Sequence, residues 1–364
     1  MTDFGDPTIL TPAPASRPPR PPVRDFSPPR NAPAFNGPAS RLPADAVIFD
    51  SLPTFSPRQL AMGAGLENPQ RTTELAWDAM QGPNASEVLC PRDFLYCNLW
   101  PPSSLAAPSS SGTAARLSAE GARAHAAFEL IERDAILRHW LAGLPGDHVS
   151  LAEAGALGEV ASAFARRGFA LSMLDCSIPR GPAVVVAVLT AAEAAWPDTV
   201  IASAAHPDPV EASRHAVSEL RTAYELAMST GPRGVPSTVQ RVHSPGDHAA
   251  FYWAAEHRDW IRHFREPEDV ISFADWSERS RISCGPVDRD SSALAGFLRE
   301  AGYTPTFLDL TAPSLRPIGI HVARCFAPEA IPLEFGLGRV RELIPAAPVA
   351  ALGSASMNRP HPFG

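Results

Sequence analysis

Apolar residues recur at intervals of three and four between Ser118 and Trp140, and this stretch contains no proline. Ser118 is a suitable N-cap, because its hydroxyl can accept a hydrogen bond from a free amide of the first turn. The pattern therefore predicts a long helix over residues 118–140. Its apolar positions form two adjoining faces, which predicts that the helix is buried between two layers.

The chain beyond this helix alternates between strand and helix patterns. Residues 183–189 are nearly all apolar and rich in valine, which predicts a strand buried on both faces. Asp208 and Pro209 begin a second helix, with proline in the first turn, where a missing amide costs little. The other expected elements are strands over 88–99, 169–176, 199–205, 306–310 and 318–326 and helices over 151–168 and 292–300. This order predicts an α+β fold of mixed layers, in which sheet packs against long helices.

Charged residues interrupt the apolar faces of the first helix. Glu129 and Glu132 are three residues apart, so both carboxylates lie on the same side of the helix. Such a pair suits Mg²⁺, which takes one or two carboxylates together with water and phosphate oxygens, and Arg133 is placed to reach a phosphate. The alternative is an ordinary ion pair between Glu129 and Arg133, worth roughly 0.3–0.5 kcal/mol. The spacing alone leaves both interpretations open.

Composition excludes several classes of protein. The chain has 364 residues, 45% of them hydrophobic, which is enough for a large core. With 31 basic and 39 acidic residues its net charge is −8, which argues against a nucleic-acid partner held by general electrostatics. No apolar stretch reaches the roughly 20 residues of a membrane helix, and no signal peptide is evident. We expect a cytoplasmic protein without a membrane partner.

Cysteines and prolines add little chemistry. The five cysteines lack a CxxC pair, which predicts free thiols rather than a disulfide framework. Cys90 and Cys97 alone make a poor zinc site. Residues 1–45 repeat proline with few aliphatic residues, so we expect this segment to be disordered or polyproline-like. The globular domain is expected to cover residues 46–364.

Three segments together resemble the YcaO family. Residues 111–116, SGTAAR, and the helix bearing Glu129-Leu-Ile-Glu132-Arg133 resemble the SNGxAxG loop and ExxER helix of that family. Residues 202–224 resemble its small-residue strand, His-x-Asp-Pro turn and following helix, which here carries Glu219. The last residues, NRPHPFG, are similar to the proline-rich terminus of YcaO enzymes that form azolines. The three motifs occur in the family's order.

The resemblance implies an enzyme of ribosomal peptide maturation that uses ATP and Mg²⁺ to activate a backbone amide, as a cyclodehydratase or in thioamidation. Glu129 and Glu132 would hold Mg²⁺, Arg133 would neutralise phosphate charge, and Glu219 would be a further ligand or an orienting group. The two carboxylates should then face one cavity. The remaining binding residues implied by the resemblance are Ser110, Ser111 and Gly112 in the loop, through their amides, and Pro360 and Pro362 in the tail. Arg339 and Arg341 are expected to face the same pocket.

The sequence also departs from the family pattern. Leu117 stands where the family favours a polar residue, and Gly121 where it has an acid. No ExxER-like motif is found between Met1 and Trp77, which suggests a domain lacking its usual N-terminal portion. We therefore expect partners: a precursor peptide and an E1-like or leader-peptide-binding protein that docks on an exposed apolar surface. The alternative is a non-catalytic subunit that binds peptide or scaffolds a synthetase complex.

Overall fold

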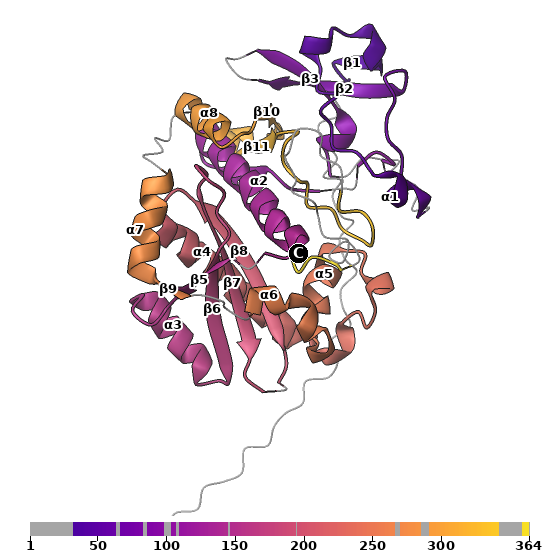
Figure 1. Cartoon of the computed structure of the whole chain (residues 1–364). Coiled ribbons are helices and arrows are strands. Elements are labelled where there is room, and N and C mark those ends of the chain that lie inside the picture. Colours follow the sequence, from indigo (N-terminus) through magenta and orange to yellow (C-terminus); the bar gives the residue numbers. More distant parts are fainter. Residues whose placement is uncertain are drawn as a thin grey trace, which may run out of the picture.

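Two β-sheets enclose the long helix α2 (Ala119–Ala142) in the computed structural model of the chain (Figure 1). The helix contributes to an apolar cluster that also contains Val186 of one sheet and Cys325 of the other. The structure describes residues 32–62, 66–82, 86–97, 103–106, 109–144, 146–193, 195–265, 270–284, 291–341 and 359–363. The α+β class and the buried position of the helix are confirmed.

Helix α2 has the ends that its sequence predicts. The Ser118 hydroxyl accepts a hydrogen bond from the Gly121 amide at 3.0 Å, which is the expected N-cap. At the other end Gly143 adopts a left-handed conformation with φ of 65°, so the helix stops there. Both apolar faces are buried, because one packs on each sheet.

A five-stranded sheet packs against α2 on one face and against two further helices on the other. Its strand order is β8 (Thr199–His206), β7 (Ala183–Ala191), β6 (Phe169–Asp175), β5 (Asp147–Ser150) and β9 (Val270–Ser272), and all pairs are antiparallel except β5 with β9. Alternate residues of β7 face opposite layers: Val184 and Val186 pack with α2, whereas Val185 packs with α4 (Pro209–Thr230) and α3 (Ala156–Ala165). The predicted burial of this strand on both faces is confirmed, and β8 is left as an edge strand.

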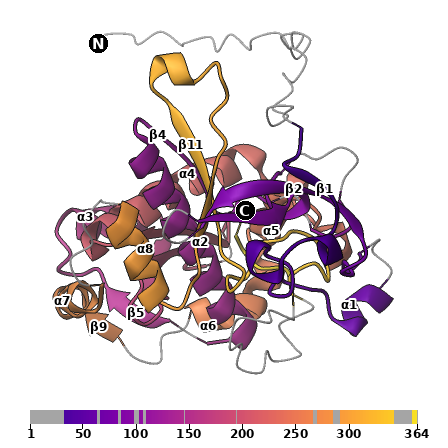
Figure 2. The same cartoon turned by 90° about the horizontal axis from the view of Figure 1, so that it is seen from above.

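The second sheet combines the early and late parts of the chain. Its strands are β1 (Phe35–Pro38), β2 (Glu74–Gln81), β3 (Glu87–Pro91), β4 (Thr113–Arg116), β10 (Thr306–Asp309) and β11 (His321–Phe326). Seen from above, β4 and β11 run side by side along the edge of this sheet (Figure 2). Strand β1 lies before Ala46, so the sheet includes residues of the proline-rich segment that was expected to be disordered.

The remaining elements are short. They include α1 (Pro57–Ala61), α5 (Pro245–Phe251), α6 (Arg262–Arg265), α7 (Phe273–Cys284) and α8 (Ser291–Glu300). The strand predicted over 88–99 stops at Pro91, because Arg92–Phe94 form a 3-10 turn in which Arg92 bonds Asp78 of β2. No described helix is long and apolar enough to cross a membrane.

Candidate functional site

Glu129, Glu132 and Arg133 lie together on the side of α2 that faces the loop before β4 and the edge of β8. Arg133 Nε is 3.3 Å from Glu129 Oε1, and Arg133 Nη1 is 3.7 Å from Glu132 Oε1. All three side chains are at least three-quarters buried. The i,i+4 ion pair expected from the spacing therefore exists, but it is part of a larger cluster in which one guanidinium is shared by two carboxylates.

Glu129 is fixed by the loop that precedes β4. Its Oε2 accepts hydrogen bonds from the Gly112 amide and, at 3.2 Å, from the Thr113 amide. Gly112 has a φ of 77°, and a Cβ there would lie 2.3 Å from the carbonyl oxygen of Cys325, so the position requires glycine. The backbone of this loop thus approaches α2 closely and holds the Glu129 carboxylate.

The Ser111 and Gly112 amides, which the family resemblance assigned to phosphate binding, already donate hydrogen bonds within the chain. The Gly112 amide points at Glu129, and the Ser111 amide donates to Ser109 Oγ at 3.2 Å. Ser110 is exposed, and its carbonyl accepts from the Thr113 amide at 3.0 Å. A role for Ser110, Ser111 and Gly112 as phosphate ligands stays a prediction.

Glu132 is held by the edge strand β8. Its Oε1 accepts from Ser203 Oγ at 2.6 Å, and its Oε2 accepts from the Ala205 amide at 3.1 Å. Because β8 pairs only with β7, this amide points away from the sheet and is free to bond the helix. Ser203 escaped the sequence analysis, since a serine inside a strand gives no signal of the helix residue that it contacts.

Glu219 joins the cluster from α4, with its side chain exposed to solvent on one side. Partial burial, followed by the negative charge of Glu132, raises the pKa of Glu219 to about 7, although Arg133 opposes the shift. The pKa of Glu129 is also raised, chiefly by burial. With all three carboxylates ionised and one guanidinium, the formal sum is −3 + 1 = −2, and proton uptake by Glu219 near neutral pH makes this sum less negative. The cluster therefore carries an excess of negative charge.

These carboxylates suit a Mg²⁺ ion that is bound partly by protein and partly by water and phosphate oxygens. Among the described residues no three His, Cys, Asp or Glu side chains come close enough to hold a metal ion by themselves. Mg²⁺ commonly takes only one or two carboxylates and completes its octahedron with water and substrate phosphates. Glu129 and Glu132 supply two carboxylates, and a divalent cation there would oppose the repulsion from Glu132 that helps to raise the pKa of Glu219.

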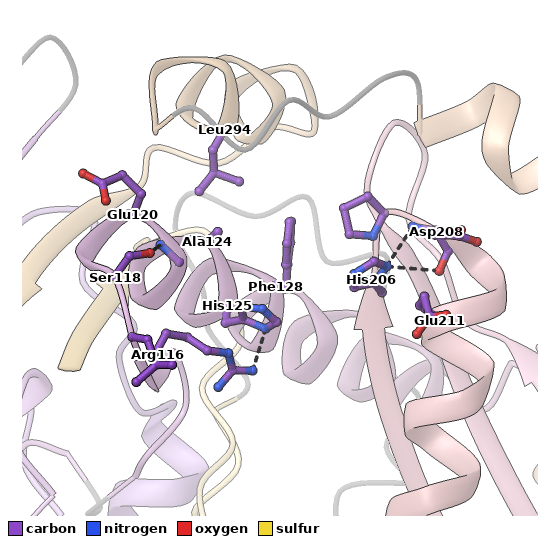
Figure 3. A pocket seen from close by; sticks show the side chains of 13 residues that line it. Arg116, Ser118, Glu120, Ala124, His125, Phe128, His206, Asp208, Glu211 and Leu294 are labelled. Carbon is purple, nitrogen blue, oxygen red and sulfur yellow. Dashed lines mark hydrogen bonds between the residues drawn. The ribbon is translucent and has the colours of Figure 1, made fainter. Parts of the chain in front are cut away.

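A cavity of about 800 Å³ lies beside the first half of α2 (Figure 3). Phe128 forms part of its wall between two histidine rings, with ring centroids 6.2 Å from His125 and 6.4 Å from His206. Arg116 Nη2 lies 2.8 Å from His125 Nδ1 at one side. The full lining is Arg116, Leu117, Ser118, Glu120, Gly121, Ala124, His125, Phe128, His206, Pro207, Asp208, Glu211 and Leu294.

Glu129 and Glu132 do not line this cavity, so the expectation that both face one cavity stays a prediction. Their carboxylates are bonded to the Gly112 loop and to β8. The cavity instead begins at Phe128, next to Glu129, and extends toward the N-terminus of α2. Leu117 and Gly121, where the sequence departs from the family pattern, both border it.

The tail residues Pro360 and Pro362 are buried near the cluster. The Pro360 carbonyl accepts a hydrogen bond from Tyr252 Oη at 2.5 Å. The neighbouring His361 is close enough to Arg133 for the guanidinium to contribute to lowering its pKa, although burial is the main cause. The structure thus brings the tail to the cluster, while Gly364 lies outside the described residues.

Arg341 does not face the site as expected. It is 1% exposed and pairs with Glu334 at 2.9 Å, and it also donates to the carbonyls of Pro53 and Leu105. It therefore joins separate loops. Among the described residues, the exposed large apolar side chains include a pair at α1, Leu60 and Met62, and a pair on α4, Leu226 and Met228. Only Leu117 of this set borders the cavity, so the set gives no docking patch there.

Taken together, the fold and the cluster define an α+β protein with an acidic, Mg²⁺-compatible site on a central buried helix. The sequence model of one family, described as YcaO cyclodehydratase, ATP- and Mg²⁺-binding, matches residues 24–331. The chain therefore belongs to the YcaO family, and ATP and Mg²⁺ are the cofactors of this family. The match begins before Ala46 and includes β1 to β3. No curated protein matches the chain in sequence.

Solved structures share the fold. A heterocyclase in complex with substrate and cofactor superposes with a TM-score of 0.68 at 19% identity, over 90% of this chain and 45% of its own. The YcaO protein of Methanopyrus kandleri, bound with AMPPCP and Mg²⁺, gives 0.54 at 21% identity over 71% and 65%. The E. coli microcin synthetase McbBCD complex with pro-MccB17 bound gives 0.58 at 11% identity over 92% and 83%. This chain spans less than half of the first heterocyclase.

Proposed function

We propose that this chain uses Mg²⁺ and ATP to activate a backbone amide of a ribosomally made peptide. The observation that carries the proposal is the gathering of three carboxyl groups, Glu129, Glu132 and Glu219, around the Arg133 guanidinium. Phosphoryl transfer depends mainly on positioning and charge neutralisation, which such a cluster supplies with bound Mg²⁺. The family description and the peptide-bound and nucleotide-bound structural neighbours support this class of reaction.

The proposed reaction is a cyclodehydration, in which the peptide loses one water molecule and ATP is converted to ADP and phosphate. A Cys, Ser or Thr side chain adds through its heteroatom to the preceding carbonyl carbon and loses its proton, which gives a tetrahedral carbon bearing an oxyanion. This oxygen takes the γ-phosphoryl group of ATP and ADP leaves. The amide nitrogen then loses its proton, the carbon–oxygen bond breaks, phosphate departs and the azoline C=N bond forms. An external sulfur donor in place of the side chain would give a thioamide.

Each residue has a distinct part in this proposal. Glu129 and Glu132 would hold Mg²⁺, and Arg133 would neutralise charge on the transferred phosphoryl group. Glu219, with its pKa near neutrality, would orient or exchange a proton with a bound group. The base and ribose of ATP would occupy the 800 Å³ cavity, whose size suits a small ligand and whose aromatic wall ends at Phe128 beside Glu129.

Steady-state phosphate release from ATP tests the proposal. The assay compares the chain alone, the chain with the precursor peptide and partner protein of its gene cluster, and the same mixture with Glu132→Gln. We expect release that requires peptide, matches the loss of water from the peptide by mass spectrometry, and disappears in Glu132→Gln. No release under any condition, with peptide binding equal in wild type and Glu132→Gln, would instead assign the chain as a non-catalytic peptide-binding subunit.

The proposed nucleotide position has its own check. Ala124→Trp places a bulky ring in the cavity without altering the acidic cluster. We expect ATP affinity to fall by at least about tenfold, which corresponds to about 1.4 kcal/mol. Unchanged affinity would show that the nucleotide binds elsewhere.

A further inference from the structure

His248 of α5 connects two segments that meet beside the acidic cluster. It is 1% exposed, and its ring nitrogens face different parts of the chain. Nδ1 is 2.9 Å from the carbonyl oxygen of His361, and Nε2 is 2.9 Å from the amide nitrogen of Gly336. A carbonyl only accepts and an amide only donates, so the ring is neutral and its proton is on Nδ1. Burial also lowers the pKa of His248 to about 4.

The segment that His248 holds is the C-terminal tail. The His361 ring lies 4.1 Å from the His248 ring, and its Nε2 donates to the Glu334 carbonyl at 3.0 Å. Tyr252 bonds the Pro360 carbonyl, and Phe363 is 2% exposed. The tail is therefore anchored by specific hydrogen bonds as well as by apolar packing.

The second segment, the turn Glu334–Gly336, is itself rigidly attached. Glu334 pairs with buried Arg341, which in turn bonds the carbonyls of Pro53 and Leu105. The Gly336 amide then donates to His248. His248 thus stands between an anchored turn and the tail, whose His361 is within electrostatic reach of Arg133.

We propose that His248 is a positioning residue that fixes the C-terminal tail, Arg359–Phe363, against the Glu334–Gly336 turn beside Arg133. The bond from Nδ1 to the His361 carbonyl is the decisive one, because the turn is held independently by Arg341. The effect on turnover rests on the proposed function. The effect on the tail does not, so the two can fail separately.

A pair of amide substitutions separates the two bonds of the ring. The side-chain nitrogen of asparagine, a donor, reaches the place of Nδ1, whereas the side-chain oxygen of glutamine, an acceptor, reaches the place of Nε2. His248→Asn therefore keeps a donor for the His361 carbonyl, and His248→Gln keeps an acceptor for the Gly336 amide. His243→Gln is the control, because His243 is exposed and lies five residues away on the same segment.

Carboxypeptidase Y removes Gly364 and then Phe363, and the rate of Phe363 release, followed by mass spectrometry on the full-length chain, reports how often the tail opens. We expect His248→Gln to speed release about tenfold, as for loss of one buried hydrogen bond. His248→Asn should restore near wild-type release, and His243→Gln should have no effect. Tyr252→Phe, which removes only the hydroxyl that holds Pro360, should also speed release.

The proposal is overturned if His248→Gln and His248→Asn release Phe363 at the same rate, since His248 would then act only by filling space. It is also overturned if neither His248→Gln nor Tyr252→Phe speeds release. Should His248→Gln fail to fold, judged by its urea midpoint, Tyr252→Phe and His248→Asn still decide the matter.

In turnover, we expect His248→Gln to lower kcat for phosphate release while KM for ATP changes less than about twofold, because the nucleotide cavity is not touched.

Discussion

Helix α2 carries two clusters of charged residues one turn apart, and they differ in how well their charges are balanced. Asp134 is fully buried, and it accepts hydrogen bonds from Arg138 at 2.7 Å, from the Ile331 amide at 2.7 Å and from the Tyr303 hydroxyl. One carboxylate there meets one guanidinium. In the neighbouring cluster Glu129 and Glu132 both pair with Arg133, and Glu219 feels the charges of all three groups. A one-to-one ion pair stabilises the fold, whereas a cluster with more carboxyl groups than cations can bind a cationic ligand.

The largest effect should come from breaking the balanced pair. Asp134→Ala leaves Arg138 without its buried partner and removes the acceptor for Ile331 and Tyr303. We expect a loss of about 3–5 kcal/mol in the free energy of unfolding, as measured by urea denaturation. A loss below about 1 kcal/mol would mean that this pair contributes little, and the contrast between the clusters would fail.

The unbalanced cluster should instead reveal itself through pH. Because the pKa of Glu219 is raised to about 7 from its ordinary value of 4.5, the folded state binds a proton that the unfolded state has lost between these two pH values. The contribution of Glu219 is therefore fully present below pH 4.5 and is lost as the pH rises through about 7. We expect the urea midpoint of wild type to fall relative to that of Glu219→Gln across this window. Parallel profiles of the two proteins would show that folding does not raise the pKa of Glu219.

The smallest effect should come from an exposed pair on α4. Glu225 lies six residues after Glu219 and pairs with Arg221 at 3.1 Å, with both side chains more than 60% exposed. Glu225→Ala should change the free energy of unfolding by no more than about 0.5 kcal/mol. This variant gives the baseline for the other two, and a loss above about 1 kcal/mol would show that surface pairs cannot serve as that baseline.

The elements that the sequence predicted well are those encoded by neighbouring residues. The Ser118 cap, the apolar periodicity of α2, the Asp208–Pro209 start of α4 and the valine-rich β7 all matched the structure. Strand β1 was missed, because a strand of four residues in a proline-rich segment has no local signal, and β11 begins only at His321, after the 3-10 turn at Arg316–Ile318.

The candidate site was predictable only in part. The spacing of Glu129 and Glu132 placed them on one side of a helix, and the family motif added Arg133 and Glu219. Their partners depend on contacts between distant parts of the chain: Ser203 is 71 residues from Glu132, and His248 is 113 residues from His361. No periodicity or motif encodes such contacts, so only the fold revealed them.

Calorimetric titration with ATP, in Mg²⁺ and in EDTA, tests most directly whether the unbalanced cluster holds Mg²⁺ and nucleotide. Wild type is compared with Glu132→Gln and with the control Glu225→Gln, whose site lies on the exposed face of α4. We predict binding in Mg²⁺ that weakens by at least about tenfold, or about 1.4 kcal/mol, in EDTA and in Glu132→Gln but not in Glu225→Gln. Equal affinity under all these conditions, or no binding by wild type in Mg²⁺, would contradict the account.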